Sequence, residues 1–232
     1  MLKMSNPYKV AIIDFGLGNL FSIKNACEQV DLKAVITSDH KMISQSQAII
    51  LPGVGAFGTA IERLRSLGLI DLLKEQVAIG KPLIGICLGM QLLMSESYEF
   101  GKHKGLDFIK GEVIKLACPA LPDGRILKIP HVGWNKIYKN TQSAVSWQDS
   151  FLSTVKNNSD FYFVHSYHVK LADPSACLSW TEYEGIKFCS ALQYKNIFAV
   201  QFHPERSGFN GLEIYRNIQT FLEKNKGVKE YA

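Results

Sequence analysis

A cysteine, a histidine and a glutamate in two distant motifs are the most reactive set of side chains in this 232-residue sequence. Cys87 lies in Gly-Ile-Cys-Leu-Gly-Met-Gln, and His203 and Glu205 lie in Phe-His-Pro-Glu. A thiol, an imidazole and a carboxylate can form, deprotonate and orient a sulfur nucleophile. These residue types predict catalysis by a Cys87 thiolate, with His203 as the base and Glu205 holding the imidazole.

Each motif follows an apolar run that is typical of a buried parallel strand. Residues 82–86 lead into Cys87, and residues 197–202 lead into His203. Open α/β sheets build their sites at the carboxyl ends of strands, so the two motifs are expected to meet there. A helix expected over residues 88–94 would begin at Cys87. Its first N–H groups would then favour the thiolate and face an incoming oxyanion.

Purely structural interpretations compete with these. A single cysteine in an apolar run is usually a small buried hydrophobic residue, and a histidine can be a hydrogen-bonded core residue. Both motifs at strand ends together favour catalysis.

Gly16-Leu17-Gly18 resembles the start of a dinucleotide-binding motif, but Phe21 stands in place of the third glycine. A tight strand-to-helix turn is therefore favoured there.

Composition excludes several classes of function. Hydrophobic residues make up 47% of the chain, and its net charge of +5 comes from scattered Lys and Arg, so we expect no nucleic-acid partner. No apolar stretch reaches the roughly 18 to 20 residues of a membrane span, so we expect a cytoplasmic protein.

The five cysteines show no CxxC spacing. His165 and His168 are three positions apart, and on one expected strand their side chains would lie on opposite faces. We therefore expect no disulfide framework, no metal and no cofactor.

The chain changes character near its middle. Strands are expected over 9–14, 34–37, 48–51 and 82–86, with helices over 20–30, 58–79 and 88–94. In the second half, strands are expected over 111–116, 125–130, 160–165, 188–194 and 197–202, before a helix that contains residues 212–222. This pattern predicts an α/β fold, a doubly wound and mostly parallel sheet with antiparallel additions, in a single domain over residues 1–232.

Five motifs together resemble those of class I glutamine amidotransferases of the triad type. The similarity is greatest to the glutaminase subunit of imidazole glycerol phosphate synthase. The motifs, in order along the chain, are residues 14–20, 51–58, 130–135, 162–167 and 202–208. The resemblance implies hydrolysis of L-glutamine to glutamate and ammonia, with the ammonia passing through a channel to a synthase subunit.

The resemblance also implies roles for residues around the triad. Backbone amides of Val54 and Leu88 would form the oxyanion hole, and Gly53 would let the peptide before Val54 reorient when a partner binds. Residues that would contact glutamine are Gly55, Gln91, Glu99, Ser166 and Tyr167. For Glu99, a solvated helix end is the structural alternative.

The acceptor of the ammonia is expected to be another polypeptide, because the chain has no phosphate-binding glycine loop of its own. The resemblance implies a (β/α)₈ barrel cyclase of histidine biosynthesis, docked near residues 130–135 and Arg206.

Some residues depart from the pattern of the synthase subunit. Val132 stands where that subunit usually has methionine, and Arg206 where it usually has lysine. Stretches 99–106 and 181–185 resemble a paralogous branch of the family. That paralogue would supply a sugar amidotransferase of surface-polysaccharide synthesis. Further alternatives on the same fold are a cysteine hydrolase and a non-catalytic interaction subunit.

Overall fold

The computed structural model describes residues 8–117 and 128–229. Its strands are β1 Lys9–Ile13, β2 Lys33–Thr37, β3 Ala48–Leu51, β4 Leu83–Ile86, β5 Met94–Ser97, β6 His103–Lys104, β7 Ile109–Lys115, β8 His131–Lys139, β9 Ser159–His165, β10 Tyr167–Leu171, β11 Cys177–Tyr183, β12 Ile186–Tyr194 and β13 Ile197–Val200. Its α-helices are α1 Leu20–Gln29, α2 His40–Ser44, α3 Phe57–Ser66, α4 Leu69–Ala78, α5 Leu88–Leu92 and α6 Gly208–Lys229, and the short 3₁₀ helices are η1 Trp147–Asp149, η2 Pro174–Ala176 and η3 Pro204–Arg206.

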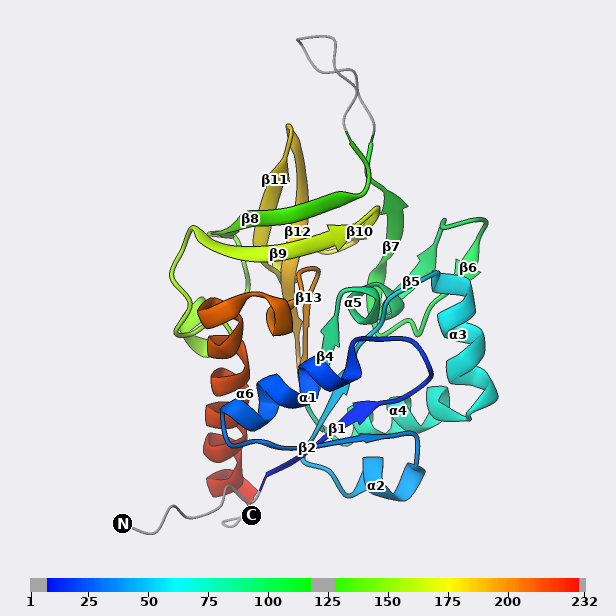
Figure 1. Ribbon diagram of the computed structural model, residues 1–232, viewed down its shortest axis with the longest axis vertical. Coiled ribbons are helices and arrows are strands. Elements are labelled where there is room, and N and C mark those ends of the chain that lie inside the picture. Colours follow the sequence, from blue (N-terminus) through cyan, green and yellow to red (C-terminus); the bar gives the residue numbers. More distant parts are fainter. Residues whose placement is uncertain (1–7, 118–127, 230–232) are drawn as a thin grey trace.

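One large sheet runs through the molecule, and its two halves differ in strand direction (Figure 1). Its order is β2-β1-β3-β4-β13-β12-β11-β8-β9. The strands from β2 to β13 are parallel, and those from β13 to β9 pair antiparallel. The predicted mixture of a mostly parallel doubly wound sheet with antiparallel additions is confirmed.

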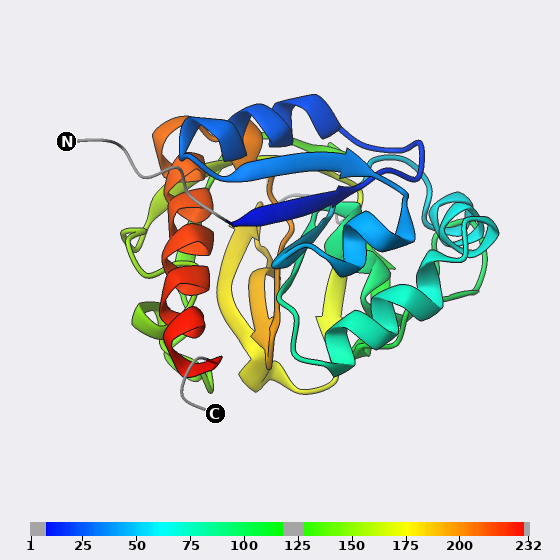
Figure 2. The ribbon, with the colours of Figure 1, turned by 90° about the horizontal axis from the view of Figure 1, so that it is seen from below.

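Helices cover both faces of the parallel half (Figure 2). Val10 and Ile12 of β1 pack in one apolar cluster with buried residues of α1 and α6. Ala11 and Ile13 of the same strand pack in the other cluster, with residues of α3 and α4. Because side chains alternate along a strand, β1 contributes to both cores, as expected for a doubly wound sheet.

A smaller sheet, in the order β10-β7-β5-β6, lies beside α5 and completes the fold. β10 follows β9 with only Ser166 between them, so the chain passes from the large sheet into the small one within one residue. No helix in the described part of the chain is long and apolar enough to cross a lipid bilayer.

Several expectations differ from the structure. The helix expected over 88–94 ends at Leu92, and Met94 begins β5. The single helix expected over 58–79 is two helices, because Gly68 adopts a left-handed backbone (φ 66°) between α3 and α4. α2, capped by the Asp39 side chain, was not expected. The strand expected over 125–130 lies mostly outside the described residues, and β8 begins only at His131. His165 and His168 lie on two different strands, β9 and β10, rather than on one.

Candidate active site

Sheet pairing places the two sequence motifs next to each other. β4 and β13 are parallel neighbours, with Ile86 opposite Val200. The backbone N–H of Cys87 donates to the Val200 carbonyl oxygen at 2.8 Å. Cys87 and His203 therefore leave the sheet at the same edge, although 116 positions separate them in the sequence.

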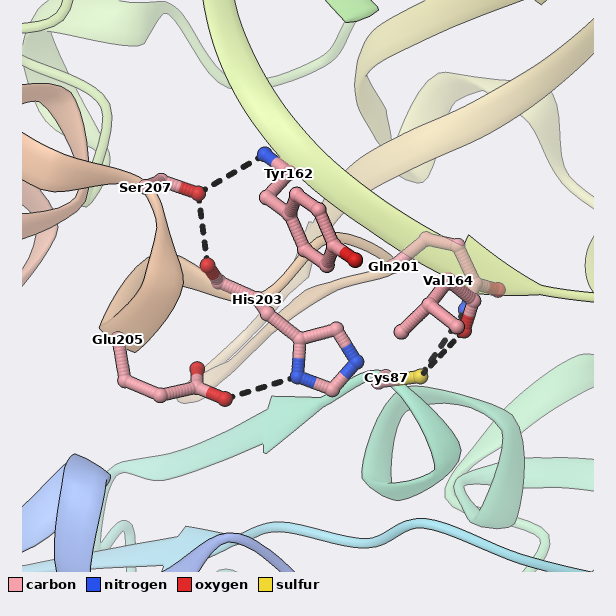
Figure 3. Close-up of polar contacts among 7 residues, drawn as sticks. All are labelled: Cys87, Tyr162, Val164, Gln201, His203, Glu205 and Ser207. Atoms are coloured by element: carbon pink, nitrogen blue, oxygen red, sulfur yellow. Dashed lines mark hydrogen bonds and ion pairs between the residues drawn. The ribbon is translucent and has the colours of Figure 1, made fainter. Parts of the chain in front are cut away.

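Cys87 forms a sharp turn between β4 and α5. Its backbone has φ 53° and ψ −108°, a region that a residue with a Cβ atom rarely adopts. Its carbonyl oxygen accepts from the N–H groups of Met90 and Gln91, at 3.0 and 3.3 Å. This turn starts the helix immediately after the sulfur and gives the thiol a buried position facing β9, where Sγ lies 3.9 Å from the Val164 carbonyl oxygen (Figure 3).

His203 and Glu205 form a buried pair beside Cys87. The Nδ1 atom of His203 lies 2.8 Å from Oε1 of Glu205, and the Glu205 side chain is fully buried. Nε2 of the ring faces the Cys87 sulfur (Figure 3), without a hydrogen bond of ordinary geometry in the described part of the chain. Catalytic hydrogen bonds are often loose before substrate binds.

The charges around His203 favour its protonated form. Burial alone would lower the pKa of the imidazole, but the Cys87 sulfur and the Glu205 carboxylate outweigh it and raise the pKa to about 10. A cationic imidazole next to a sulfur atom stabilises the thiolate. The arrangement therefore places a cationic imidazole, supported by a carboxylate, beside a potential sulfur nucleophile.

The backbone of His203 is held by β9. Its N–H donates to the Tyr162 carbonyl oxygen at 2.9 Å, and the Ser207 hydroxyl donates to the His203 carbonyl oxygen at 2.7 Å. The Ser207 oxygen also accepts from the Tyr162 N–H at 3.0 Å (Figure 3). Ser207 belongs to the sequence motif over residues 202–208, but nothing in that motif predicts these two hydrogen bonds.

A cavity of about 280 Å³ opens beside the Cys87 sulfur. Its lining residues are Val54, Gly55, Cys87, Leu88, Gln91, Glu99, Pro130, Val164, His165, Ser166 and Tyr167. Every residue that was expected to contact the substrate is among them, as are Val54 and Leu88. Gly53 is not among the lining residues, and a Cβ atom there would be 3.1 Å from the Leu88 Cβ atom. Pro130, Val164 and His165 were not expected to line it.

Glu99 occupies a more constrained place than the solvated helix end considered above. Its Oε2 atom accepts from the backbone N–H of Phe57, the first residue of α3, at 2.5 Å. The Glu99 side chain also lines the cavity, together with Tyr167. Burial and the nearby Glu99 charge raise the pKa of the Tyr167 phenol. A carboxylate therefore lies in the wall of the cavity.

Gln91 and Gln201 link the two walls of the cavity. Nε2 of Gln91 donates to the Tyr167 carbonyl oxygen at 2.9 Å and to Oε1 of Gln201 at 3.1 Å. Nε2 of Gln201 in turn donates to the Cys87 sulfur at 3.6 Å. Sequence reasoning missed Gln201, and the one signal was a polar residue at the end of an apolar strand.

The described residues contain no group of three or more His, Cys, Asp or Glu side chains arranged to hold a metal ion.

Comparisons with known proteins agree with this geometry. Residues 11–218 match the family model described as glutamine amidotransferase class-I. Imidazole glycerol phosphate synthase subunit HisH of Aquifex aeolicus is 41% identical over 217 residues, which cover 93% of this chain and 98% of that protein. HisH 1 of Legionella pneumophila (strain Paris) is 40% identical over 214 residues, covering 92% of this chain and 98% of that protein.

Solved structures support the fold. A putative GMP synthase protein from Thermoplasma acidophilum aligns with a TM-score of 0.67 at 16% identity and covers 96% of this chain and 98% of that one. PurLQS from Thermotoga maritima aligns with the same TM-score and identity, over 93% of this chain and 99% of that one. Because the family model and the sequence relatives match nearly the whole chain, the protein belongs to the class I glutamine amidotransferases and, within them, to the family of the HisH glutaminase subunit of imidazole glycerol phosphate synthase.

Proposed function

We propose that Cys87, His203 and Glu205 hydrolyse L-glutamine to glutamate and ammonia, and that the ammonia serves a separate synthase subunit of histidine biosynthesis. The observation that carries this proposal is the ring of His203, held on one side by Glu205 and facing the Cys87 sulfur with the other (Figure 3). The resemblance of the whole chain to HisH subunits supports the choice of substrate.

The first half of the reaction makes a thioester. The Cys87 thiolate attacks the side-chain amide carbon of glutamine, and the negative charge moves to the amide oxygen. Backbone N–H groups of Val54 and Leu88 would receive that oxygen; Leu88 opens α5, where N–H groups have no partner within the helix. The His203 imidazolium gives its proton to the departing nitrogen, so that ammonia leaves as the carbon–nitrogen bond breaks.

The second half regenerates the enzyme. Neutral His203 takes a proton from a water molecule, and the resulting hydroxide attacks the thioester carbon. The carbon–sulfur bond breaks, glutamate leaves and the thiolate returns beside the imidazolium. Glu205 holds the ring in one tautomer through both halves.

Glutamine would lie along the cavity with its ammonium group toward Glu99, whose carboxylate is already held by Phe57. Both N–H groups of the Gln91 amide have acceptors, so its Oε1 is the atom left to accept from an N–H of the substrate. Gly55, Ser166 and Tyr167 would complete the opposite wall. Gly55 has φ +103°, which favours glycine.

We also propose that the partner is a (β/α)₈ barrel cyclase and that it docks over the edge of the sheet that carries Cys87. Val132 and Trp134 on β8 are exposed, and Trp134 packs edge-on against Tyr162 of β9, whose carbonyl oxygen holds His203. The Arg206 guanidinium stacks on the same Tyr162 ring, 4.4 Å from its centre. A single catalytic domain over residues 1–232 is part of the proposal, supported by the one large sheet that joins both halves.

The direct test is glutamate release from glutamine by the purified chain, alone and with a barrel cyclase partner. We expect slow release alone, faster release with the partner and only background release by Cys87→Ala in either case. Cys189→Ala removes a thiol from β12 and should leave the rate unchanged. Turnover that survives Cys87→Ala, or cleavage of peptides without glutamine turnover, would overturn the assignment.

A further inference from the structure

A chain of hydrogen bonds ends on the nucleophilic sulfur. Gln201, directly after β13, has a fully buried side chain whose Nε2 donates to Cys87 Sγ. Its Oε1 accepts from Gln91. Since both N–H groups of the Gln91 amide point at oxygen atoms, Gln201 must present its oxygen to Gln91 and its N–H to the sulfur.

Two histidines approach the Tyr167 carbonyl oxygen, the same acceptor that Gln91 uses. The Tyr167 carbonyl oxygen, which accepts from Gln91, lies 2.9 Å from Nδ1 of His165. A carbonyl oxygen can only accept, so His165 Nδ1 carries a proton. Nε2 of His165 lies 3.1 Å from Nδ1 of His131, and the Asn135 amide nitrogen lies 3.4 Å from Nε2 of His131.

Burial keeps both histidine rings neutral and so determines which ring nitrogen donates. It lowers the pKa of His131 to about 4 and that of His165 to about 3, so both rings are neutral near pH 7. A neutral His165 with its proton on Nδ1 has an acceptor at Nε2, so His131 donates to it from Nδ1. His131 then has an acceptor at Nε2, which the Asn135 amide fills. The Asn135 amide and the two rings therefore donate in one direction that ends at the Tyr167 carbonyl oxygen, which also accepts from Gln91.

Reversal of any member would place a buried donor against a donor, or an acceptor against an acceptor, which costs more than a simple loss of contact. The Gln201 amide is therefore held with its N–H on the sulfur. Hydrogen bonds to a charged atom are stronger than those between neutral groups, so this donor favours the thiolate over the thiol.

We propose that Gln201 is a positioning residue for this reaction: its amide N–H stabilises and orients the Cys87 thiolate, and Gln91, itself oriented by the Tyr167 carbonyl oxygen, locks the amide in that orientation. The inference rests on the proposed function only in taking Cys87 as the nucleophile. The alternative is that Gln201 is a polar core residue whose contacts serve folding alone.

The test measures the sulfur directly in the free chain. Cys87 is alkylated with iodoacetamide across a range of pH, and the modified peptide is quantified by mass spectrometry. Gln201→Met is close in size but has no N–H donor, and Gln201→Glu keeps the acceptor for Gln91 while placing an oxygen beside the sulfur. We expect Gln201→Met to slow alkylation at neutral pH about tenfold and to move its profile to higher pH, and Gln201→Glu to move it further.

Glutamine hydrolysis in the complex with the cyclase gives a second readout. There Gln201→Met should lower kcat about tenfold or more, with a smaller change in KM, because the donor acts on the nucleophile and not on the substrate. Gln193→Met makes the same chemical change on β12, away from the sulfur, and should match the wild type in both measurements.

Gln91→Met tests the lock, and it also carries the test if neither Gln201 variant folds. It leaves the Gln201 amide in place but frees it to rotate, so a smaller upward shift of the alkylation profile is expected. Folded variants whose profiles coincide with that of the wild type would overturn the proposal. A shifted profile in a chain that never hydrolyses glutamine would support Gln201 as the positioning residue and reject the proposed function.

Discussion

At the scale of single residues, the nucleophile combines chemistry with backbone strain. Cys87 keeps its unusual φ and ψ because its N–H is bonded to β13 and its carbonyl oxygen to the first turn of α5. Such strain costs of the order of 1–3 kcal/mol and persists only where surrounding contacts enforce it. The resulting turn lets the sulfur face both His203 and the cavity.

Replacement of Cys87 by glycine should separate activity from stability. We expect Cys87→Gly to lack glutaminase activity and to be more stable than Cys87→Ala by about 1 kcal/mol, because glycine adopts φ 53° without a Cβ clash. Thermal unfolding of the two variants checks this. An alanine variant as stable as the glycine variant would show that the turn is unstrained.

Removal of the Glu205 charge should change the pH profile of the reaction. Glu205→Gln takes away one of the groups that raise the pKa of His203 to about 10, so that pKa falls. The imidazolium is then lost at lower pH, and the alkaline limb of partner-activated glutaminase should shift to lower pH, with kcat reduced about 10²-fold. Glu213→Gln, on α6 and paired with Arg216, should leave the profile in place.

The two buried histidines should make stability fall in mild acid. Their folded pKa values, about 4 for His131 and about 3 for His165, lie below the usual value near 6.5, so the unfolded chain takes up protons first. Their contribution is complete above pH ~6.5 and is lost as the pH falls toward 4, by about 3 kcal/mol for His165.

His165→Asn should therefore flatten the dependence of unfolding free energy on pH between about 6.5 and 4. Phe163→Leu removes volume from the same buried cluster without a titrating group, and it should lower stability by a similar amount at every pH. Denaturant unfolding at several pH values distinguishes the two. Parallel curves for wild type and His165→Asn would contradict the assignment of neutral rings.

At the scale of elements, two glycines let helices approach the site closely. A Cβ atom at Gly89 of α5 would lie 1.8 Å from the Leu51 carbonyl oxygen, and one at Gly211 of α6 would lie 1.8 Å from that of Pro204. α5 is therefore pressed against the end of β3, and α6 against η3. Both contacts fix the positions of Cys87 and His203.

Gly89→Ala should push α5 away from β3 and displace Cys87. We expect a stability loss of at least about 1–3 kcal/mol and a large fall in kcat, because the clash is with backbone atoms that cannot turn aside. Gly80→Ala, at φ +85° with open space around it, carries only the backbone cost, about 1 kcal/mol, and should keep full activity. Equal kinetics for the two variants would refute this role of Gly89.

The sequence predicted those elements whose signal is local. Apolar runs located the strands that end at Cys87 and before His203, and the rule for parallel sheets placed both ends at one edge. The break at Gly68 was missed, because glycine within an apolar helical pattern is compatible with either a continuous helix or a turn. Gln201 and Ser207 were missed because their bonds, to Cys87 and Tyr162, join residues 114 and 45 positions apart.

At the scale of the whole molecule, the cavity is shared by the two halves of the large sheet. The parallel half contributes Cys87 and the loop with Val54, and the antiparallel half contributes Val164 at the end of β9. Ser166, the one residue between β9 and β10, and Tyr167 at the start of β10 complete the wall. Because the antiparallel strands also carry the exposed surface proposed for docking, a partner seated there would touch the wall of the glutamine site.

The surface proposed for docking, the aromatic face, consists of Val132, Trp134, Tyr162 and Arg206. The Trp134 side chain is 58% exposed although it packs against Tyr162, which is unusual for so large an apolar group. Tryptophan and arginine are the residues that most often dominate protein interfaces. The face therefore has the composition of a docking site, and it includes Tyr162, whose carbonyl oxygen holds the backbone of His203.

Trp134→Ala should weaken association with a barrel cyclase by about 2 kcal/mol, roughly thirtyfold in Kd, and should reduce partner-activated glutaminase at limiting partner concentration. Ile79→Ala is the matched control: Ile79 is 64% exposed, but it precedes β4 and so lies at the opposite edge of the sheet from Cys87. Titration calorimetry of each variant with the cyclase measures the two Kd values and shows which side chain contributes to binding. If Ile79→Ala weakens binding and Trp134→Ala does not, the partner docks on the far edge, and ammonia would have no short path from Cys87 to it.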